Sequence, residues 1–240
     1  MPGIDTFVAI GDSFTEGLND PDPAGGFRGW ADRVAAALSA QRPGFRYANL
    51  AIRGKLLGQV VAEQVSRAVE LAPDLVSLAA GGNDILRGSD VDALAGQFES
   101  AVAKLQAAGC RVLIFTGFDP RMFPVIRLLR GRIAAYDMHL RGIADSYGCD
   151  LVDLWSMRAL KDTRSWSPDR LHLTRAPIAG CSFIRFGDDP DTGHEIYPDV
   201  RTGHGQLTSP DVSLDSIIDL VAHAPEDIMR VIAEVRRLRG

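Results

Sequence analysis

The chain contains no apolar run long enough to span a lipid bilayer, and it contains little cysteine. Its three cysteines, Cys110, Cys149 and Cys181, are widely spaced and form no C-x-x-C pair. An odd, scattered set favours free thiols over a disulfide framework or a metal site, and we expect them to be buried. Residues 1–5 lack the basic and apolar regions of a signal peptide, which favours a cytoplasmic location.

Basic clusters and phosphate-binding glycine motifs are also missing. The formal net charge is −5, which argues against a nucleic-acid partner. Neither a G-x-G-x-x-G nor a Walker A pattern occurs, so a nucleotide-binding module is disfavoured. The 240 residues, of which 46% are hydrophobic and 24% charged, are typical of a globular chain with one sizeable domain.

Short apolar runs alternate with amphipathic stretches through most of the chain. The predicted strands are residues 6–10, 46–50, 75–79, 111–115 and 150–153, and the predicted helices between them are residues 30–40, 57–72, 90–108 and 131–147. Strands separated by helices form βαβ units, and these units build a parallel sheet with helices on both faces. The sequence therefore predicts an α/β fold.

This alternation ends near Thr174. Residues 176–209 are rich in Gly, Asp, Pro and His and show no helical or strand period, whereas residues 213–239 predict a helical hairpin. We therefore expect a domain over residues 1–175 and an atypical tail over residues 176–240, with a helical appendage at the C-terminus. Two interpretations of this tail stay open: a replacement that covers the sheet, or a foreign segment that leaves part of it exposed.

A serine follows the first predicted strand. Gly11-Asp12-Ser13 ends the apolar run 6–10, and the carboxyl end of a strand is where α/β sheets place their ligands and chemistry. Ser13 is therefore a candidate nucleophile, although a serine at this position is also typical of a helix cap or turn.

Two further glycine-containing turns follow predicted strands. Gly81-Gly82-Asn83-Asp84 comes after the run 75–79, and Asn83 has an amide N–H suited to stabilising a developing negative charge. Gly54 follows the run 46–50 and offers a backbone N–H at the same edge of the sheet. Each turn alone is equally compatible with an ordinary strand-to-helix connection.

A carboxylate and an imidazole follow the fifth predicted strand as Asp169-Arg170-Leu171-His172. A carboxylate beside a histidine fixes its tautomer and stabilises the imidazolium, as a general base requires. A second pair with the same spacing, Asp191 and His194, lies in the irregular region. On spacing alone both pairs are candidates, and the irregular surroundings of Asp191 and His194 favour Asp169 and His172.

Taken in order, the four blocks resemble those of the SGNH hydrolases, also called GDSL esterases and lipases. The resemblance covers about residues 5–174 and is carried by Gly11-Asp12-Ser13, Gly54, Gly81-Gly82-Asn83-Asp84 and Asp169-Arg170-Leu171-His172. It implies a flavodoxin-like three-layer α/β/α sandwich with a five-stranded parallel sheet. It also implies an esterase that hydrolyses small or medium acyl esters through an acyl-enzyme intermediate, with no metal or organic cofactor.

The same resemblance implies the roles of the site residues. Ser13 would be the nucleophile, His172 the general base and Asp169 the group that orients His172. The backbone N–H groups of Ser13 and Gly54 and the Asn83 side chain would form the oxyanion hole. A non-catalytic flavodoxin-like binding module, or a hydrolase impaired by its atypical tail, is the alternative, and the approach of His172 to Ser13 discriminates between them.

The substrate side of the site is less specified by the sequence. The segment 122–129, which follows the fourth predicted strand, carries Met122, Phe123, Val125, Ile126, Leu128 and Leu129. Such a cluster is typical of an acyl pocket, and it is equally typical of the buried face of the next helix.

Overall fold

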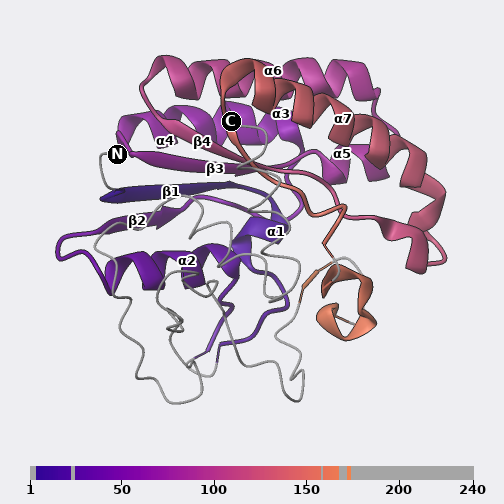
Figure 1. Ribbon diagram of the computed structural model, residues 1–240, viewed down its shortest axis with the longest axis horizontal. Helices are drawn as coiled ribbons and strands as arrows, with labels where there is room; N and C mark the ends of the chain where they lie inside the picture. Colours follow the sequence, from indigo (N-terminus) through magenta and orange to yellow (C-terminus); the bar gives the residue numbers. More distant parts are fainter. Residues whose placement is uncertain (1–3, 23–24, 158, 168–171, 174–240) are drawn as a thin grey trace, which may run out of the picture.

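The computed structural model describes residues 4–22, 25–157, 159–167 and 172–173 (Figure 1). The predicted tail, including the helical hairpin 213–239, lies outside the described residues. So do Asp169, Cys181 and the pair Asp191 and His194. The domain boundary at residue 175 and the alternatives for the tail therefore stay predictions.

The centre of the fold is a five-stranded parallel sheet with the strand order β2-β1-β3-β4-β5. Its strands are β1 (Thr6–Gly11), β2 (Arg46–Asn49), β3 (Leu75–Ala79), β4 (Arg111–Phe115) and β5 (Asp150–Val152). The order reverses between β1 and β3, and this switch point is where open α/β sheets bind ligands. The five predicted strands are confirmed, with ends shifted by one residue at most.

Seven α-helices occur in the described part of the chain. They are α1 (Ser13–Glu16), α2 (Trp30–Ser39), α3 (Leu57–Val60), α4 (Ser66–Glu70), α5 (Gly82–Leu86), α6 (Val91–Ala107) and α7 (Arg130–Tyr147). A π-helical turn over Val61–Val65 joins α3 to α4, where the sequence predicted one continuous helix. Short 3-10 turns span Pro120–Met122, Ile126–Leu129, Ala159–Lys161 and Thr163–Ser165.

The helices form layers on the two faces of the sheet. In Figure 1, α2 lies on one face and the helices α3 to α7 lie on the other. Successive strand side chains enter opposite layers: Phe7 and Ala9 pack with the α2 side, whereas Val8 and Ile10 pack with the other side. These two hydrophobic cores confirm the predicted three-layer α/β/α sandwich.

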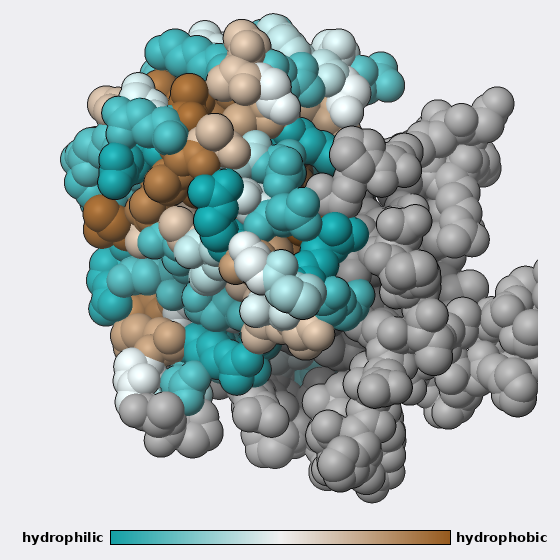
Figure 2. All heavy atoms as spheres, turned by 90° about the vertical axis from the view of Figure 1, so that its left-hand side faces the viewer, coloured by the Kyte–Doolittle hydropathy of each residue, from teal (hydrophilic) through white to brown (hydrophobic). Residues whose placement is uncertain are grey.

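The helix α1, which begins at Ser13, lies at the carboxyl ends of the strands (Figure 1). Figure 2 shows the other end of the molecule, where hydrophilic residues surround smaller apolar areas. Of the helices that the structure describes, none has the length and apolar character needed to cross a membrane.

Candidate active site

Ser13 is positioned by a rigid turn between β1 and α1. The Gln64 side chain makes two hydrogen bonds to the backbone of Gly11 at the end of β1. Its Oε1 accepts from the Gly11 N–H at 2.8 Å, and its Nε2 donates to the Gly11 carbonyl at 3.0 Å. Gly11 has a φ of +149° and no space for a side chain against the Ala79 carbonyl. Asp12 then caps α1 by accepting the Phe14 N–H at 3.1 Å, which places Ser13 at the first position of the helix.

His172 reaches Ser13 directly. Its Nε2 lies 2.7 Å from the Ser13 Oγ, within the range of a short hydrogen bond. The backbone around His172 is tied to the fold, because its carbonyl accepts the Ser167 N–H at 2.8 Å and Leu173 forms an antiparallel bridge with Trp166. A serine hydroxyl bonded to an imidazole is the arrangement from which a base can remove the hydroxyl proton.

Asn83 lies next to the turn of Ser13. Its Nδ2 donates to the Asp12 carboxylate at 3.3 Å and to the Lys55 carbonyl at 3.0 Å. Asp84 follows on the same helix and accepts the Leu57 N–H at 2.9 Å, so it ties α5 to α3. The sequence interpretation of Asp12 and Asp84 as supports of their turns agrees with these bonds.

Gly54 occupies a turn with both flanks anchored near the site. Its φ of +73° favours glycine. On one side Glu16 of α1 accepts from the backbone N–H of Arg53 at 2.9 Å and from its guanidinium at 2.8–3.0 Å. On the other side the Lys55 carbonyl accepts from Asn83. Gly54 is not among the residues that line the pocket described next.

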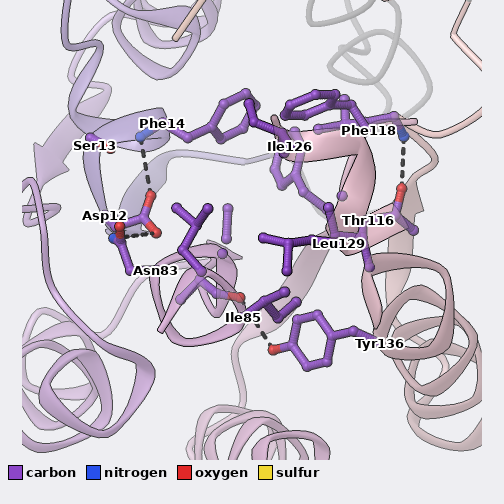
Figure 3. Close-up of a pocket in the computed structure, with 18 of the residues that line it drawn as sticks. Asp12, Ser13, Phe14, Asn83, Ile85, Thr116, Phe118, Ile126, Leu129 and Tyr136 are labelled. Atoms are coloured by element: carbon purple, nitrogen blue, oxygen red, sulfur yellow. Dashed lines mark hydrogen bonds between the residues drawn. The ribbon is translucent and has the colours of Figure 1, made fainter. Parts of the chain in front are cut away.

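A pocket of about 200 Å³ opens beside Ser13, and it is lined mostly by apolar side chains. Asp12, Ser13 and Asn83 lie on one side of it, and Thr116, Phe118 and Leu129 lie on the other (Figure 3). Ile85 and Tyr136 lie below them, and the Tyr136 hydroxyl donates to the Ala80 carbonyl at 3.2 Å. The remaining lining residues include His172, Phe14, Leu86, Phe115, Ile126, Ile133, Leu140 and Leu154.

The segment 122–129 divides between the two roles that the sequence left open. Ile126 and Leu129 line the pocket, as an acyl site would require. Phe123 is buried against the rings of Phe118 and Trp166, which also contact each other. Val125 and Leu128 neither line the pocket nor pack in the core, because 77% and 81% of their surfaces are exposed.

Burial changes the acidity of the groups around the pocket. It raises the pKa of Asp12 to about 6, against the lowering effects of the Phe14 N–H and His172. It also raises the pKa of Tyr136 well above its ordinary value. Asp12 is therefore less acidic than an exposed aspartate, and Tyr136 stays protonated as a hydrogen-bond donor.

Two buried polar residues at the site were missed in the sequence. Gln64 is one, and Asp137 is the other: it is fully buried in α7, and its Oδ1 accepts the Gly117 N–H at 2.7 Å. Both stand on otherwise apolar helix faces, with Val60 and Ala68 around Gln64. A single polar residue on an apolar stripe is the signal that marks such positions.

Neither the described cysteines nor a group of metal ligands contributes to the pocket. Cys110 is buried and Cys149 is half-buried, and both are free thiols. Burial raises the pKa of Cys149 to about 11, so it is a poor nucleophile at neutral pH. Among the described residues, no three His, Cys, Asp or Glu side chains are grouped so as to hold a metal ion.

Known structures share this fold. TesA is 24% identical with a TM-score of 0.59, and the match covers 70% of this chain and 88% of that one. An acetylxylan esterase from Geobacillus stearothermophilus is 22% identical with a TM-score of 0.59, covering 72% and 88%. The psychrotrophic esterase EstA from Pseudoalteromonas sp., inhibited by monoethylphosphonate, is 18% identical with a TM-score of 0.57, covering 72% and 90%.

The family comparison identifies the chain more specifically. No curated protein matches it. The model of the GDSL-like Lipase/Acylhydrolase family matches residues 9–176, a range that includes the turn of Ser13, the turn of Asn83 and His172. The chain therefore belongs to the GDSL-like lipase/acylhydrolase family and is a hydrolase of ester bonds.

Proposed function

We propose that this chain is a serine esterase that hydrolyses small or medium acyl esters through an acyl-enzyme intermediate. The observation that carries the proposal is the 2.7 Å separation between the His172 Nε2 and the Ser13 Oγ at the mouth of an apolar pocket. The alternative, a hydrolase that has lost its activity, required His172 to lie out of reach of Ser13. This separation favours the active enzyme.

In the proposed mechanism the Ser13 Oγ attacks the acyl carbon while His172 takes the hydroxyl proton. His172 then gives that proton to the leaving alcohol, and the acyl group stays bonded to Ser13. Water attacks the acyl-enzyme in the second half, with His172 again as the base. Asp169, which precedes His172 by three residues, is proposed to orient the imidazole.

The oxyanion of each tetrahedral intermediate is proposed to accept from the backbone N–H groups of Ser13 and Gly54 and from the Asn83 Nδ2. Of the two bonds that Asn83 makes, the one to Asp12 is longer, at 3.3 Å against 3.0 Å. We expect this N–H to turn toward the substrate, while the bond to the Lys55 carbonyl keeps the amide in place.

The pocket supports an acyl group of intermediate length. Its volume is about 200 Å³, whereas a cavity of about 150 Å³ is enough to hold a benzene ring of six carbons. At the same volume per carbon, the pocket would accept a chain of roughly eight carbons. Ile126, Leu129 and Ile133 offer an apolar wall and no charged partner, which suits an alkyl chain.

The test is a rate series on p-nitrophenyl esters from acetate to dodecanoate. We expect rates to rise with chain length to a maximum at six to eight carbons, by the volume estimate of roughly eight. Ser13→Ala is expected to lose about 10³-fold or more of the rate. Ser100→Ala, on the exposed side of α6, is the matched control and should keep the full rate. Equal rates for the wild type and Ser13→Ala would refute the proposal.

A further inference from the structure

The segment between β4 and α7 has an apolar face toward the pocket and a second apolar face toward solvent. Ile126 and Leu129 line the pocket. Val125 and Leu128, each one residue before them, are 77% and 81% exposed. We call residues 119–130 the mouth segment. Its two exposed aliphatic side chains contribute nothing to the core and lie beside the proposed acyl site.

The mouth segment is held in place from beneath. Phe123 is buried, with its ring centroid 6.0 Å from that of Phe118 and 5.3 Å from that of Trp166. Asp119 caps the 3-10 turn Pro120–Met122 by accepting the Arg121 N–H at 3.1 Å. Since the base of the segment is packed and capped, the two aliphatic side chains are presented to solvent by a defined structure.

Positive charge surrounds these aliphatic side chains. Residues 121–132 contain four arginines and no acidic residue, in a chain whose net charge is −5. Arg121, Arg127 and Arg130 are exposed. Asp119 accepts from Arg130 at 2.7 and 3.1 Å and forms a longer ion pair with Arg121 at 3.9 Å, so this one carboxylate offsets part of the charge. Within the described part of the chain, Arg127 makes no ion pair.

We propose that the mouth segment docks on an anionic lipid surface, with Val125 and Leu128 entering the apolar layer and the arginines contacting the headgroups. Aliphatic side chains flanked by cations are the composition that binds membrane interfaces. Each arginine near an anionic surface strengthens binding by about fivefold. A protein partner is less favoured, because protein hot spots centre on aromatic anchors in pockets, whereas these are two protruding aliphatic side chains.

Docking in this orientation would bring the pocket and Ser13 to the lipid surface. An acyl ester leaving the lipid layer would then enter the pocket that Ile126, Leu129 and Ser13 line. This delivery step rests on the proposed esterase function. The binding step does not, so the two are tested separately.

Binding is measured by sedimentation with vesicles, using the full chain carrying Ser13→Ala so that no ester is consumed. Vesicles of phosphatidylcholine with phosphatidylglycerol are compared with vesicles of phosphatidylcholine alone. We expect binding to the anionic vesicles, and we expect Val125→Ser with Leu128→Ser to weaken it by about tenfold or more, because two buried aliphatic side chains are lost. Met138→Ser is the matched control, since Met138 on α7 is 72% exposed and lies outside the mouth segment.

Charge is tested with Arg127→Glu, which is expected to weaken binding to the anionic vesicles by about tenfold or more, since two units of charge change. Lys104→Glu, an exposed position on α6, should leave binding unchanged. Absence of binding to anionic vesicles, equal binding to both kinds of vesicle, or an unchanged affinity of the double serine variant would each overturn the proposal.

Hydrolysis of water-soluble p-nitrophenyl acetate separates the two proposals. We expect the double serine variant to hydrolyse this ester at the wild-type rate, because neither residue lines the pocket. A wild-type protein that binds anionic vesicles and hydrolyses no ester would refute the esterase proposal and leave the docking surface standing. A wild-type protein that hydrolyses the ester and does not bind the anionic vesicles would overturn the docking proposal alone.

Discussion

Replacing Asp137 with asparagine is expected to change the pH dependence of stability. Asp137 is fully buried in α7, and its Oδ2 has no hydrogen-bond partner among the described residues. Burial raises its pKa from 3.8 to about 7, although the Gly117 N–H and Arg141 act in the opposite direction and Asp153 adds to the rise. The folded protein therefore carries a buried carboxylate at pH 8 that it would hold as a neutral acid at pH 5.

The size of the effect follows from this shift. Because the pKa in the folded state lies above that in the unfolded state, Asp137 favours folding most below about pH 4, and this contribution is lost as the pH rises through about 7. A shift from 3.8 to about 7 corresponds to about 4 kcal/mol over the whole range. Between pH 5 and pH 8 the share lost is about 2–3 kcal/mol.

Asparagine removes this dependence but introduces a cost of its own. Its Oδ1 can still accept the Gly117 N–H, whereas its buried NH₂ group would lack an acceptor, at about 1–3 kcal/mol independent of pH. We therefore expect Asp137→Asn to be less stable than the wild type at pH 5. Between pH 5 and pH 8, its free energy of unfolding should rise by about 2–3 kcal/mol relative to that of the wild type.

Urea unfolding at pH 5 and pH 8 measures the difference directly. Asp145→Asn is the control, because Asp145 is exposed on the same helix and its replacement should leave the pH dependence as in the wild type. A difference between Asp137→Asn and the wild type that stays constant from pH 5 to pH 8 would show that Asp137 does not titrate in this range, and the reasoning would be wrong.

Three further predictions concern catalysis, and steady-state kinetics check each of them. Asn83→Ala should lower kcat by about 10²–10³-fold through the loss of one oxyanion donor; an unchanged kcat would exclude Asn83 from this role. Glu16→Gln should lower kcat by about tenfold with little change in KM, because the hydrogen bonds from Arg53 to the Glu16 carboxylate position the turn of Gly54. An effect on KM alone would contradict this. Leu129→Trp should shift the preferred p-nitrophenyl ester toward acetate by filling the pocket, and an unchanged preference would place the acyl chain elsewhere.

Much of the fold could be predicted because the central strands β1, β3 and β4 are short apolar runs that end at a turn. The run 75–79, for example, is followed by Ala80 and then two glycines, and the observed β3 has the predicted bounds. The π-helical turn over Val61–Val65 could not be predicted, since the apolar pattern of residues 57–72 is also that of a regular helix. Such a turn closes its backbone hydrogen bonds over one residue more than a regular helix does, and packing against neighbouring elements decides whether it forms.

The site likewise combines features that the sequence predicted with features that it did not. Ser13, Asn83 and His172 were predicted from their order at strand ends, and the parallel sheet brings all three to one pocket. The hydrogen bonds between Gln64 and Gly11 join residues 53 positions apart in the chain, and no local sequence pattern specifies such a pairing. The division of the segment 122–129 between core, pocket and solvent likewise depended on tertiary packing. The role of Asp169 stays a prediction.

The central claim is that Ser13 is the nucleophile and that His172 activates it. The most direct test is intact-mass and peptide mass spectrometry after brief treatment with a fluorophosphonate, which bonds to activated serines. We predict a single adduct on the peptide that contains Ser13, and we predict its loss in Ser13→Ala and its strong slowing in His172→Ala, with His139→Ala labelled like the wild type. An adduct on another residue, or labelling of Ser13 that does not depend on His172, would contradict the account.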